Sequence, residues 1–281
     1  MELKKQLGQH FLKDAGILER LVRLIRPGPA DVIVEVGAGE GALSARLAPP
    51  AGRLLAVEVD RDCLERLQAA LASHPNARVV HGDILEIDLP ALVSGDLEPD
   101  SRLRIVGNLP YNLATAIIVR MLDLTLPIHD MVFLVQLEVA ERITASPGSR
   151  QYGYFSVRCQ HLCSTKMGMR VPPSCFVPRP QVMSAAVTLT LRDAPRFPEL
   201  EESTWEVAKA AFAYRRKTLA NSFRHDPAVA PVADVLLSRA GISGSLRAER
   251  LSVEDYARLG RLYHELHRSI MIFPGAQPPR P

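Results

Sequence analysis

The sequence predicts an α/β protein, with an open, mostly parallel sheet and helices between its strands, followed by a small all-helical domain. Apolar runs of the buried-strand type alternate with helical patterns between residues 31 and 143. A glycine-rich turn directly follows the first of these runs and opens a helix, as in many open α/β sheets. After residue 192 only helical patterns remain.

Domain boundaries follow from the same patterns. We assign residues 1–192 to the α/β domain with an N-terminal arm, residues 193–272 to the helical domain, and residues 273–281 to a disordered tail. Pro195 and Pro198 mark the linker between the two domains, and the tail is rich in proline.

Composition indicates an ordinary globular protein. Of the 281 residues, 47% are hydrophobic and 23% are charged, and no apolar run approaches the ~20 residues that span a bilayer. The first residues lead into no signal-peptide hydrophobic region. The four cysteines suggest neither a disulfide framework nor a metal site, because Cys159 and Cys163, expected on one helix, lack a second ligand pair. We expect a cytoplasmic monomer with no membrane span and no metal.

The N-terminal arm is longer than an α/β domain of this kind needs. About thirty residues precede the first strand, and Asp14 is the expected N-cap of a helix that extends to Ile25. His10 and Leu12 lie just before this cap. The arm is expected either to close over a ligand or to contact a large substrate, and a basic, half-ordered arm is the alternative.

The first two strands end in residues suited to a nucleotide cofactor. Gly37 and Gly39 follow the strand at residues 31–36, where glycine lets the backbone approach a ligand closely. The strand at residues 53–58 ends in Glu58, which is placed to bind ribose hydroxyls. These features suit NAD and S-adenosyl-L-methionine (SAM) about equally, so an NAD-dependent oxidoreductase stays open at this point.

The third strand favours SAM. Asp83 follows the strand at residues 77–81 and is placed to accept a hydrogen bond from the adenine amino group of SAM. A helix N-cap is the alternative role for this residue. Since the carboxyl ends of successive strands meet at one edge of an open α/β sheet, Asp83 would lie near the glycine-rich turn.

The fourth strand, at residues 103–106, leads into the turn Asn108-Leu109-Pro110-Tyr111. The Asn108 side-chain oxygen and the Leu109 carbonyl can accept hydrogen bonds from an exocyclic amino group, and Pro110 restricts the backbone. Tyr111 can stack on the attached ring. The turn therefore suits a flat nitrogen nucleophile.

The remaining elements of the first domain end in a β-hairpin. Phe176 lies in a proline-rich loop at residues 172–180, which we expect to hold it outward, and a buried core position is the alternative. The other expected elements are helices at residues 112–122 and 138–143 and strands at residues 131–136, 169–171 and 182–191.

The helical domain carries a run of cations. Helices are expected at residues 205–213, 214–219, 230–239 and 253–267. Arg215, Arg216 and Lys217 are consecutive, so they cannot share one helical face, and either a phosphate contact or a solvated turn fits them. The formal net charge of +3 comes wholly from residues 192–281, so a polyanionic partner would meet local clusters rather than a global field.

Short motifs extend over nearly the whole chain, at residues 7–12, 35–41, 58–60, 82–83, 108–111, 138–142, 152–153, 176–182 and 211–219. Together they resemble those of the small-subunit ribosomal RNA adenine dimethyltransferases, which have a Rossmann-like SAM-dependent methyltransferase fold. The run of Arg215, Arg216 and Lys217 before Thr218 and Leu219 favours this branch over the related macrolide-resistance methylases.

The resemblance implies roles for individual residues. It implies that Tyr111 and Phe176 sandwich the target adenine. The sequence departs from the family at three positions. His10 stands where Asn is common, Leu137 where Lys is expected and Met183 where Asp is expected. The implied SAM contacts are His10, Leu12, Gly37, Gly39, Glu58, Asp83 and Asn108.

The activity implied is dimethylation of N6 on two adjacent adenines in a hairpin loop near the 3′ end of small-subunit (16S) rRNA, during ribosome biogenesis. The implied partner is this rRNA or the immature small subunit. A large-subunit rRNA adenine methylase of the macrolide-resistance type and a non-catalytic ribosome-assembly factor are the alternatives.

Overall fold

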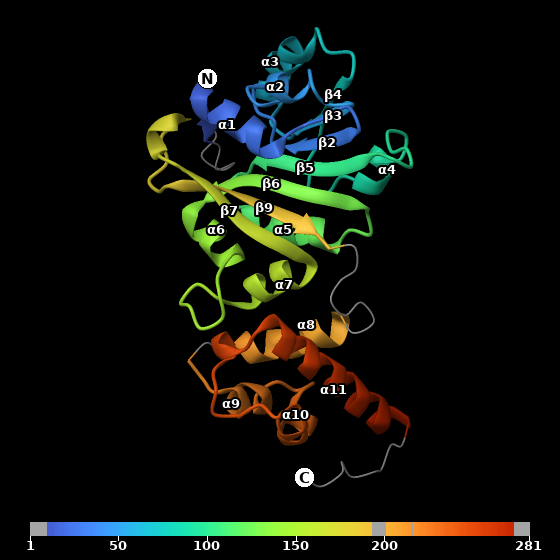
Figure 1. Cartoon of the computed structure of the whole chain (residues 1–281), viewed down its shortest axis with the longest axis vertical. Helices are drawn as coiled ribbons and strands as arrows, with labels where there is room; N and C mark the ends of the chain where they lie inside the picture. Colours follow the sequence, from blue (N-terminus) through green and yellow to red (C-terminus); the bar gives the residue numbers. More distant parts are fainter. Residues whose placement is uncertain (1–9, 193–200, 215, 273–281) are drawn as a thin grey trace. The chain divides into compact units, whose positions relative to one another are not determined.

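The computed structural model describes residues 10–192, 201–214 and 216–272, with only the backbone described at 201 and 268–272 (Figure 1). These residues form two compact units. The first holds the chain up to residue 141 together with residues 165–191, and the second holds residues 142–164 together with the chain from residue 192 onward. Residues 142–164, which we expected in the first domain, thus have their contacts in the second unit. The expected tail, residues 273–281, lies outside the described residues.

A seven-stranded sheet forms the centre of the first unit, in the order β4-β3-β2-β5-β6-β9-β7. The strands from β4 to β6 in this order are parallel, and β9 pairs antiparallel with β6. The predicted α/β class is confirmed. The strand bounds are Asp31–Val36 (β2), Arg53–Glu58 (β3), Ala77–His81 (β4), Arg102–Asn108 (β5), Ile128–Gln136 (β6), Cys163–Val171 (β7) and Ser184–Leu191 (β9).

The centre of this sheet determines where a ligand can bind. β2 is buried along its whole length, as its mainly apolar sequence predicts. The chain moves outward from β2 to β3 and β4 on one side and from β5 to β6 on the other. Such a reversal of strand order leaves a crevice at the carboxyl ends of the two central strands.

Side-chain caps explain where two helices of this unit begin. The Asp14 carboxylate accepts a hydrogen bond from the Ile17 amide at 2.9 Å, as predicted, and the Asp60 carboxylate caps α3. The helix after the glycine-rich turn begins at Ser44. The helix bounds are Ala15–Ile25 (α1), Ser44–Leu47 (α2), Arg61–Leu71 (α3), Leu89–Val93 (α4), Ala114–Asp123 (α5) and Leu137–Ile143 (α6).

A second, two-stranded sheet joins the N-terminal arm to the proline-rich loop. β1 (Phe11–Leu12) pairs antiparallel with β8 (Phe176–Val177), and Leu12 lies opposite Phe176. The Lys13 amide extends this ladder by donating to the Cys175 carbonyl at 2.9 Å. Phe176 is only 2% exposed and belongs to the apolar core, so the expectation that the loop holds it outward is wrong.

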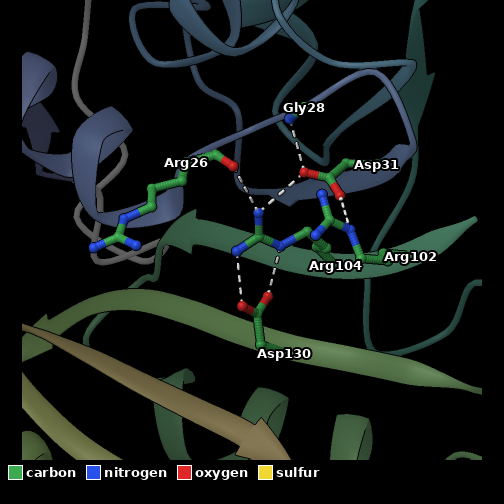
Figure 2. A network of polar contacts seen from close by, with 6 residues as sticks. All are labelled: Arg26, Gly28, Asp31, Arg102, Arg104 and Asp130. Carbon is green, nitrogen blue, oxygen red and sulfur yellow. Dashed lines mark hydrogen bonds and ion pairs between the residues drawn. The ribbon is translucent and has the colours of Figure 1, made fainter.

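A buried ionic network ties the strands together at their amino ends (Figure 2). The Arg104 guanidinium donates two hydrogen bonds to the Asp130 carboxylate, at 2.7 and 2.8 Å, and one to Asp31 at 3.0 Å. Asp31 also accepts from Arg102 at 2.8 Å and from the Gly28 amide at 2.8 Å. Since Asp31 is fully buried, its charge is stabilised by these donors alone among the described residues.

The second unit is helical apart from its connections. Tyr256 and Tyr263 lie in its core. The expectation of a helix at residues 214–219 is wrong for the described residues 214 and 216–218, since α8 ends at Phe212 and α9 begins at Leu219. No helix among the described residues has the length and apolar character needed to cross a bilayer. The helices are Tyr154–Leu162 (α7), Glu201–Phe212 (α8), Leu219–Arg224 (α9), Ala233–Ala240 (α10) and Val253–Ile272 (α11).

Candidate active site

The glycine-rich turn and the Asn108 turn lie next to each other because they follow neighbouring parallel strands. Glu35 of β2 is opposite Val106 of β5, which brings the two strand ends together. Gly37 and Gly39 have φ values of 67° and 57°, in the left-handed region that favours glycine. The two turns therefore meet at one sheet edge, as the rule for the carboxyl ends of neighbouring parallel strands predicts.

Glu58 is attached to the glycine-rich turn. One carboxylate oxygen accepts from the Gly39 amide at 2.6 Å and the other from the Asp60 amide at 2.8 Å. Burial raises the pKa of Glu58, while these backbone donors oppose that rise. The carboxylate is therefore held rigidly at the end of β3, where it is only 3% exposed.

Asn108 has its amide orientation set by the N-terminal arm. Its Nδ2 donates to the His10 carbonyl at 2.7 Å, across 98 residues of sequence. Its Oδ1 is buried and has no hydrogen-bond partner among the described residues. A carbonyl accepts but cannot donate, so the arrangement leaves the Asn108 oxygen as a preorganised acceptor.

Tyr111 and His10 form a ring pair beside this acceptor. Their ring centroids are 4.9 Å apart with an interplanar angle of 32°. The Tyr111 hydroxyl bonds to the Ser184 hydroxyl at 2.6 Å, and burial raises the pKa of Tyr111. The His10 Nδ1 donates to the Pro178 carbonyl at 2.7 Å. The His10 side chain thus connects the arm to the proline-rich loop, and its cofactor contact remains a prediction.

Two cavities open beside these residues, of about 70 and 40 Å³. Both are lined by Phe11, Gly37, Gly39 and Asn108. The first is also lined by His10, Glu58, Val59, Leu109, Pro110 and Leu113. The second is also lined by Leu12, Lys13, Leu18, Glu35, Ala38, Glu40, Ala42 and Leu43. Most of the predicted cofactor residues therefore come together around one region.

Three predicted site residues do not line either cavity. Asp83 accepts from the Leu85 amide at 2.8 Å and so caps a turn rather than a helix, since the next helix, α4, has Asp88 as its N-cap. Tyr111 lies beside the first cavity through its neighbour Pro110, and Phe176 is in the core. Their assigned roles remain predictions.

Glu35 is a residue that the sequence reasoning missed. It is 2% exposed, lines the second cavity, and its Oε2 has no hydrogen-bond partner among the described residues. Burial, and to a smaller extent the nearby Glu58, raise the pKa of Glu35 to about 8. The available signal was an acid within an otherwise apolar buried strand.

Phe11 and Lys13 were also missed. A Cβ atom on Gly39 would lie 2.9 Å from the Phe11 ring, so the arm is in close contact with the glycine-rich turn. Lys13 pairs with Glu40 of the same turn at 2.5 Å, which lowers the pKa of Glu40. Short arms of this kind have no periodicity from which such contacts could be predicted.

The four cysteines are all buried. Cys159 lies on α7 but Cys163 begins β7, so the expectation of one helix for both is wrong. Burial raises the pKa of the Cys163 thiol to about 12. In the part of the chain that the structure describes, no cluster of His, Cys, Asp and Glu is arranged to hold a metal ion.

The predicted basic run lies in the second unit. Arg216 and Lys217 are exposed in the connection between α8 and α9. Arg215 lies outside the described residues, as do residues 7–9 of the first motif. RNA binding by this run remains a prediction.

Comparison with known proteins gives consistent matches. The model of the family "Ribosomal RNA adenine dimethylase" matches residues 1–265. The chain is 38% identical over 272 residues to "Ribosomal RNA small subunit methyltransferase A" of Shouchella clausii, covering 95% of this chain and 92% of that protein. It is 37% identical over 258 residues to the protein of the same name from Methylococcus capsulatus, covering 92% and 96%.

Two solved structures share the fold. A dimethyladenosine transferase from Plasmodium falciparum matches with a TM-score of 0.77 and 20% identity, covering 91% of this chain and 98% of that one. The 23S rRNA methyltransferase ErmE matches with a TM-score of 0.70 and 25% identity, covering 90% and 99%.

Proposed function

Since the chain belongs to the ribosomal RNA adenine dimethylase family, we propose that it dimethylates N6 of two adjacent adenines in a hairpin loop near the 3′ end of small-subunit rRNA. Membership makes it an rRNA adenine dimethyltransferase rather than an NAD-dependent oxidoreductase. The relatives at 36–39% identity are named for the small subunit, whereas the large-subunit enzyme ErmE is 25% identical. This difference favours the small-subunit substrate over the macrolide-resistance type.

The cofactor proposed is SAM, which supplies the methyl group when bound. Its sulfonium and ammonium groups are cationic, and the two cavities have Glu35 and Glu58 in their walls. Both carboxylates are buried, and Glu35 has an oxygen without a partner in the described chain. The residues therefore fit a cationic ligand. We propose that Gly37 and Gly39 let SAM approach the backbone closely and that Glu58 binds its ribose. Asp83, His10 and Leu12 are proposed to make the remaining contacts.

The observation that carries the proposed mechanism is the orientation of Asn108. The adenine amine is a weak nucleophile because its lone pair is delocalised into the ring. An amine that donates to both the Asn108 Oδ1 and the Leu109 carbonyl is held in one orientation. Such orientation can supply much of the rate enhancement of methyl transfer. The hydrogen bond from Asn108 Nδ2 to the His10 carbonyl prevents the amide from rotating its nitrogen towards the amine.

The base itself is proposed to stack on Tyr111. Loop adenines are unpaired, so extruding one costs little free energy. Tyr111 is half-buried and its hydroxyl is anchored to Ser184, which fixes the plane of the ring. A sandwich with Phe176 would require this side chain to leave the core, so we propose Tyr111 as the main stacking surface.

The proposed partner is the immature small ribosomal subunit, which implies a cytoplasmic location. Arg216 and Lys217, with Arg215, are proposed to contact its phosphates. We propose that the protein acts as a monomer.

Asn108→Ala tests this proposal. Unmethylated small subunits are incubated with protein and SAM, and N6,N6-dimethyladenosine is measured in the rRNA. The variant should lose at least about 100-fold in methyl transfer, as when a positioned polar group at a reacting centre is removed, and should keep its affinity for the subunit. Asn112→Ala, which removes an exposed amide four residues away, is the matched control and should resemble the parent. Equal loss of binding and transfer, or methylation of large-subunit rRNA instead, would refute the proposal.

A further inference from the structure

The connection between α8 and α9 presents an aromatic ring and two cations to solvent. Tyr214 is 44% exposed. Few other large hydrophobic side chains among the described residues are exposed to this degree. The Lys217 amide donates to the Tyr214 carbonyl at 2.9 Å, so the main chain makes a tight turn here. Arg216 and Lys217 are exposed in this turn.

The Tyr214 ring is supported without being buried. It lies edge-to-face on the ring of His225, the C-cap of α9, with centroids 5.3 Å apart and an interplanar angle of 61°. The His225 Nδ1 donates to the Asn221 carbonyl at 2.7 Å, which fixes the His225 ring in turn. Tyr214 is therefore held in one orientation although nearly half of it faces water.

The cations near Tyr214 differ in whether an acidic side chain already pairs with them. Arg224 pairs with Asp234 at 2.9 Å. Within residues 10–192, 201–214 and 216–272, no ion pair is recorded for Arg216 or Lys217. Two cations are thus available within three residues of a supported aromatic ring.

We propose that Tyr214 stacks on an unpaired RNA base, next to the phosphates that Arg216 and Lys217 are proposed above to contact. This rests on the proposed action on rRNA. A positively charged groove with an aromatic platform is the usual way that proteins hold single-stranded nucleic acid, since every base has a π face and every nucleotide a phosphate. The excess positive charge of residues 192–281 is consistent with such a partner.

The two contributions can be separated because stacking does not depend on salt, whereas phosphate contacts do. The full chain is titrated into a fluorescein-labelled 12-nucleotide single-stranded RNA of mixed sequence, and into a blunt duplex of the same strand, from 50 to 300 mM KCl. Tyr214→Leu should weaken single-strand binding about tenfold with the salt slope unchanged. Tyr214→Phe keeps the ring and should bind like the parent.

The charge variant should behave differently. Replacing Arg216 and Lys217 together with Ala should lower the salt slope for the single strand by about 1.4, at about 0.7 per phosphate contact. Arg239→Ala, an exposed cation on α10, is the charge control and should leave the slope unchanged. Melting temperature and SAM affinity should be the same in all variants.

Three results would overturn the proposal. They are equal binding by Tyr214→Leu and the parent, equal weakening of the single strand and the duplex by Tyr214→Leu, and no measurable single-strand binding by the parent at 50 mM KCl. None of them bears on methylation of the small subunit, which the Asn108 experiment tests separately.

Discussion

Glu35 should make the stability of this protein fall as pH rises. Its ordinary pKa of 4.5 applies to the unfolded chain, and burial raises the pKa to about 8 in the folded protein. Between these two values the unfolded state ionises while the folded state keeps its proton, so unfolding releases a proton. The contribution is therefore fully present below pH 4.5 and is lost as pH rises through 8.

The size of the effect follows from the two pKa values. At about 1.4 kcal/mol per pKa unit, the free energy of unfolding would fall by up to about 5 kcal/mol between pH 4.5 and pH 8. Glu35→Gln keeps the shape of the side chain but cannot ionise. Glu35→Gln should therefore become more stable relative to the parent as pH rises. The difference in unfolding free energy should be about 2–5 kcal/mol larger at pH 8.5 than at pH 5.

Urea unfolding followed by far-ultraviolet circular dichroism at half-unit pH steps measures this difference. Glu19→Gln, an exposed glutamate on α1, is the matched control and should leave the pH dependence unchanged. SAM provides a second measurement, because a cationic ligand beside Glu35 favours its ionised form. SAM should bind the parent more tightly as pH rises from 7 to 8.5, and this trend should be weaker in Glu35→Gln. Parallel stability curves for the parent and Glu35→Gln would refute the reasoning.

Three further substitutions test the scaffold and the base site. Asp130→Ala leaves the buried Arg104 without its bidentate partner and should cost about 3–5 kcal/mol in urea unfolding; a loss below about 1 kcal/mol would contradict a structural role for the network. Tyr111→Phe should keep most methyl transfer and Tyr111→Ala should lose it, whereas a severe defect in the Phe variant would assign the role to the hydroxyl bonded to Ser184. Phe176→Ala should lower stability by about 3–5 kcal/mol, as expected for a core aromatic, and an unchanged melting temperature would contradict its burial.

The parts of the fold that could be predicted are those encoded locally. The central strands were predicted because each is mainly apolar, and the meeting of Gly37 and Asn108 follows from the rule for the carboxyl ends of parallel strands. The contacts of the arm could not be predicted, because β1 and β8 are two residues long and about 165 residues apart in sequence. Phe176 was placed wrongly for the same reason, since its neighbour Leu12 comes from that distant strand.

The same limit applies within the candidate site. The residue types at the Asn108 turn predicted an acceptor, but which amide atom points to the substrate depends on the His10 carbonyl, 98 residues away. Glu35 was passed over because a single acid inside a strand has no distinctive spacing. Its importance is visible only once burial and the missing partner of its Oε2 in the described chain are known.

The two departures at Leu137 and Met183 show how the structure changes the interpretation of a sequence difference. The Leu137 amide donates to the Met183 carbonyl at 2.9 Å, so the two residues are backbone neighbours just beyond the paired ends of β6 and β9, and both are half-buried. Since Lys and Asp are the residues expected at these two neighbouring positions, we interpret the departures as one paired exchange of two opposite charges for two apolar side chains, which leaves the net local charge unchanged.

This exchange should be visible as coupling between the two positions. Leu137→Lys or Met183→Asp alone places a half-buried charge against an apolar side chain and should lower the melting temperature, whereas the double variant should recover much of the loss. Because Ser184 follows Met183 directly and bonds to the Tyr111 hydroxyl, each single variant should also reduce methyl transfer more than SAM affinity. Additive losses in the double variant would mean that the two positions act independently and that the departures are separate changes.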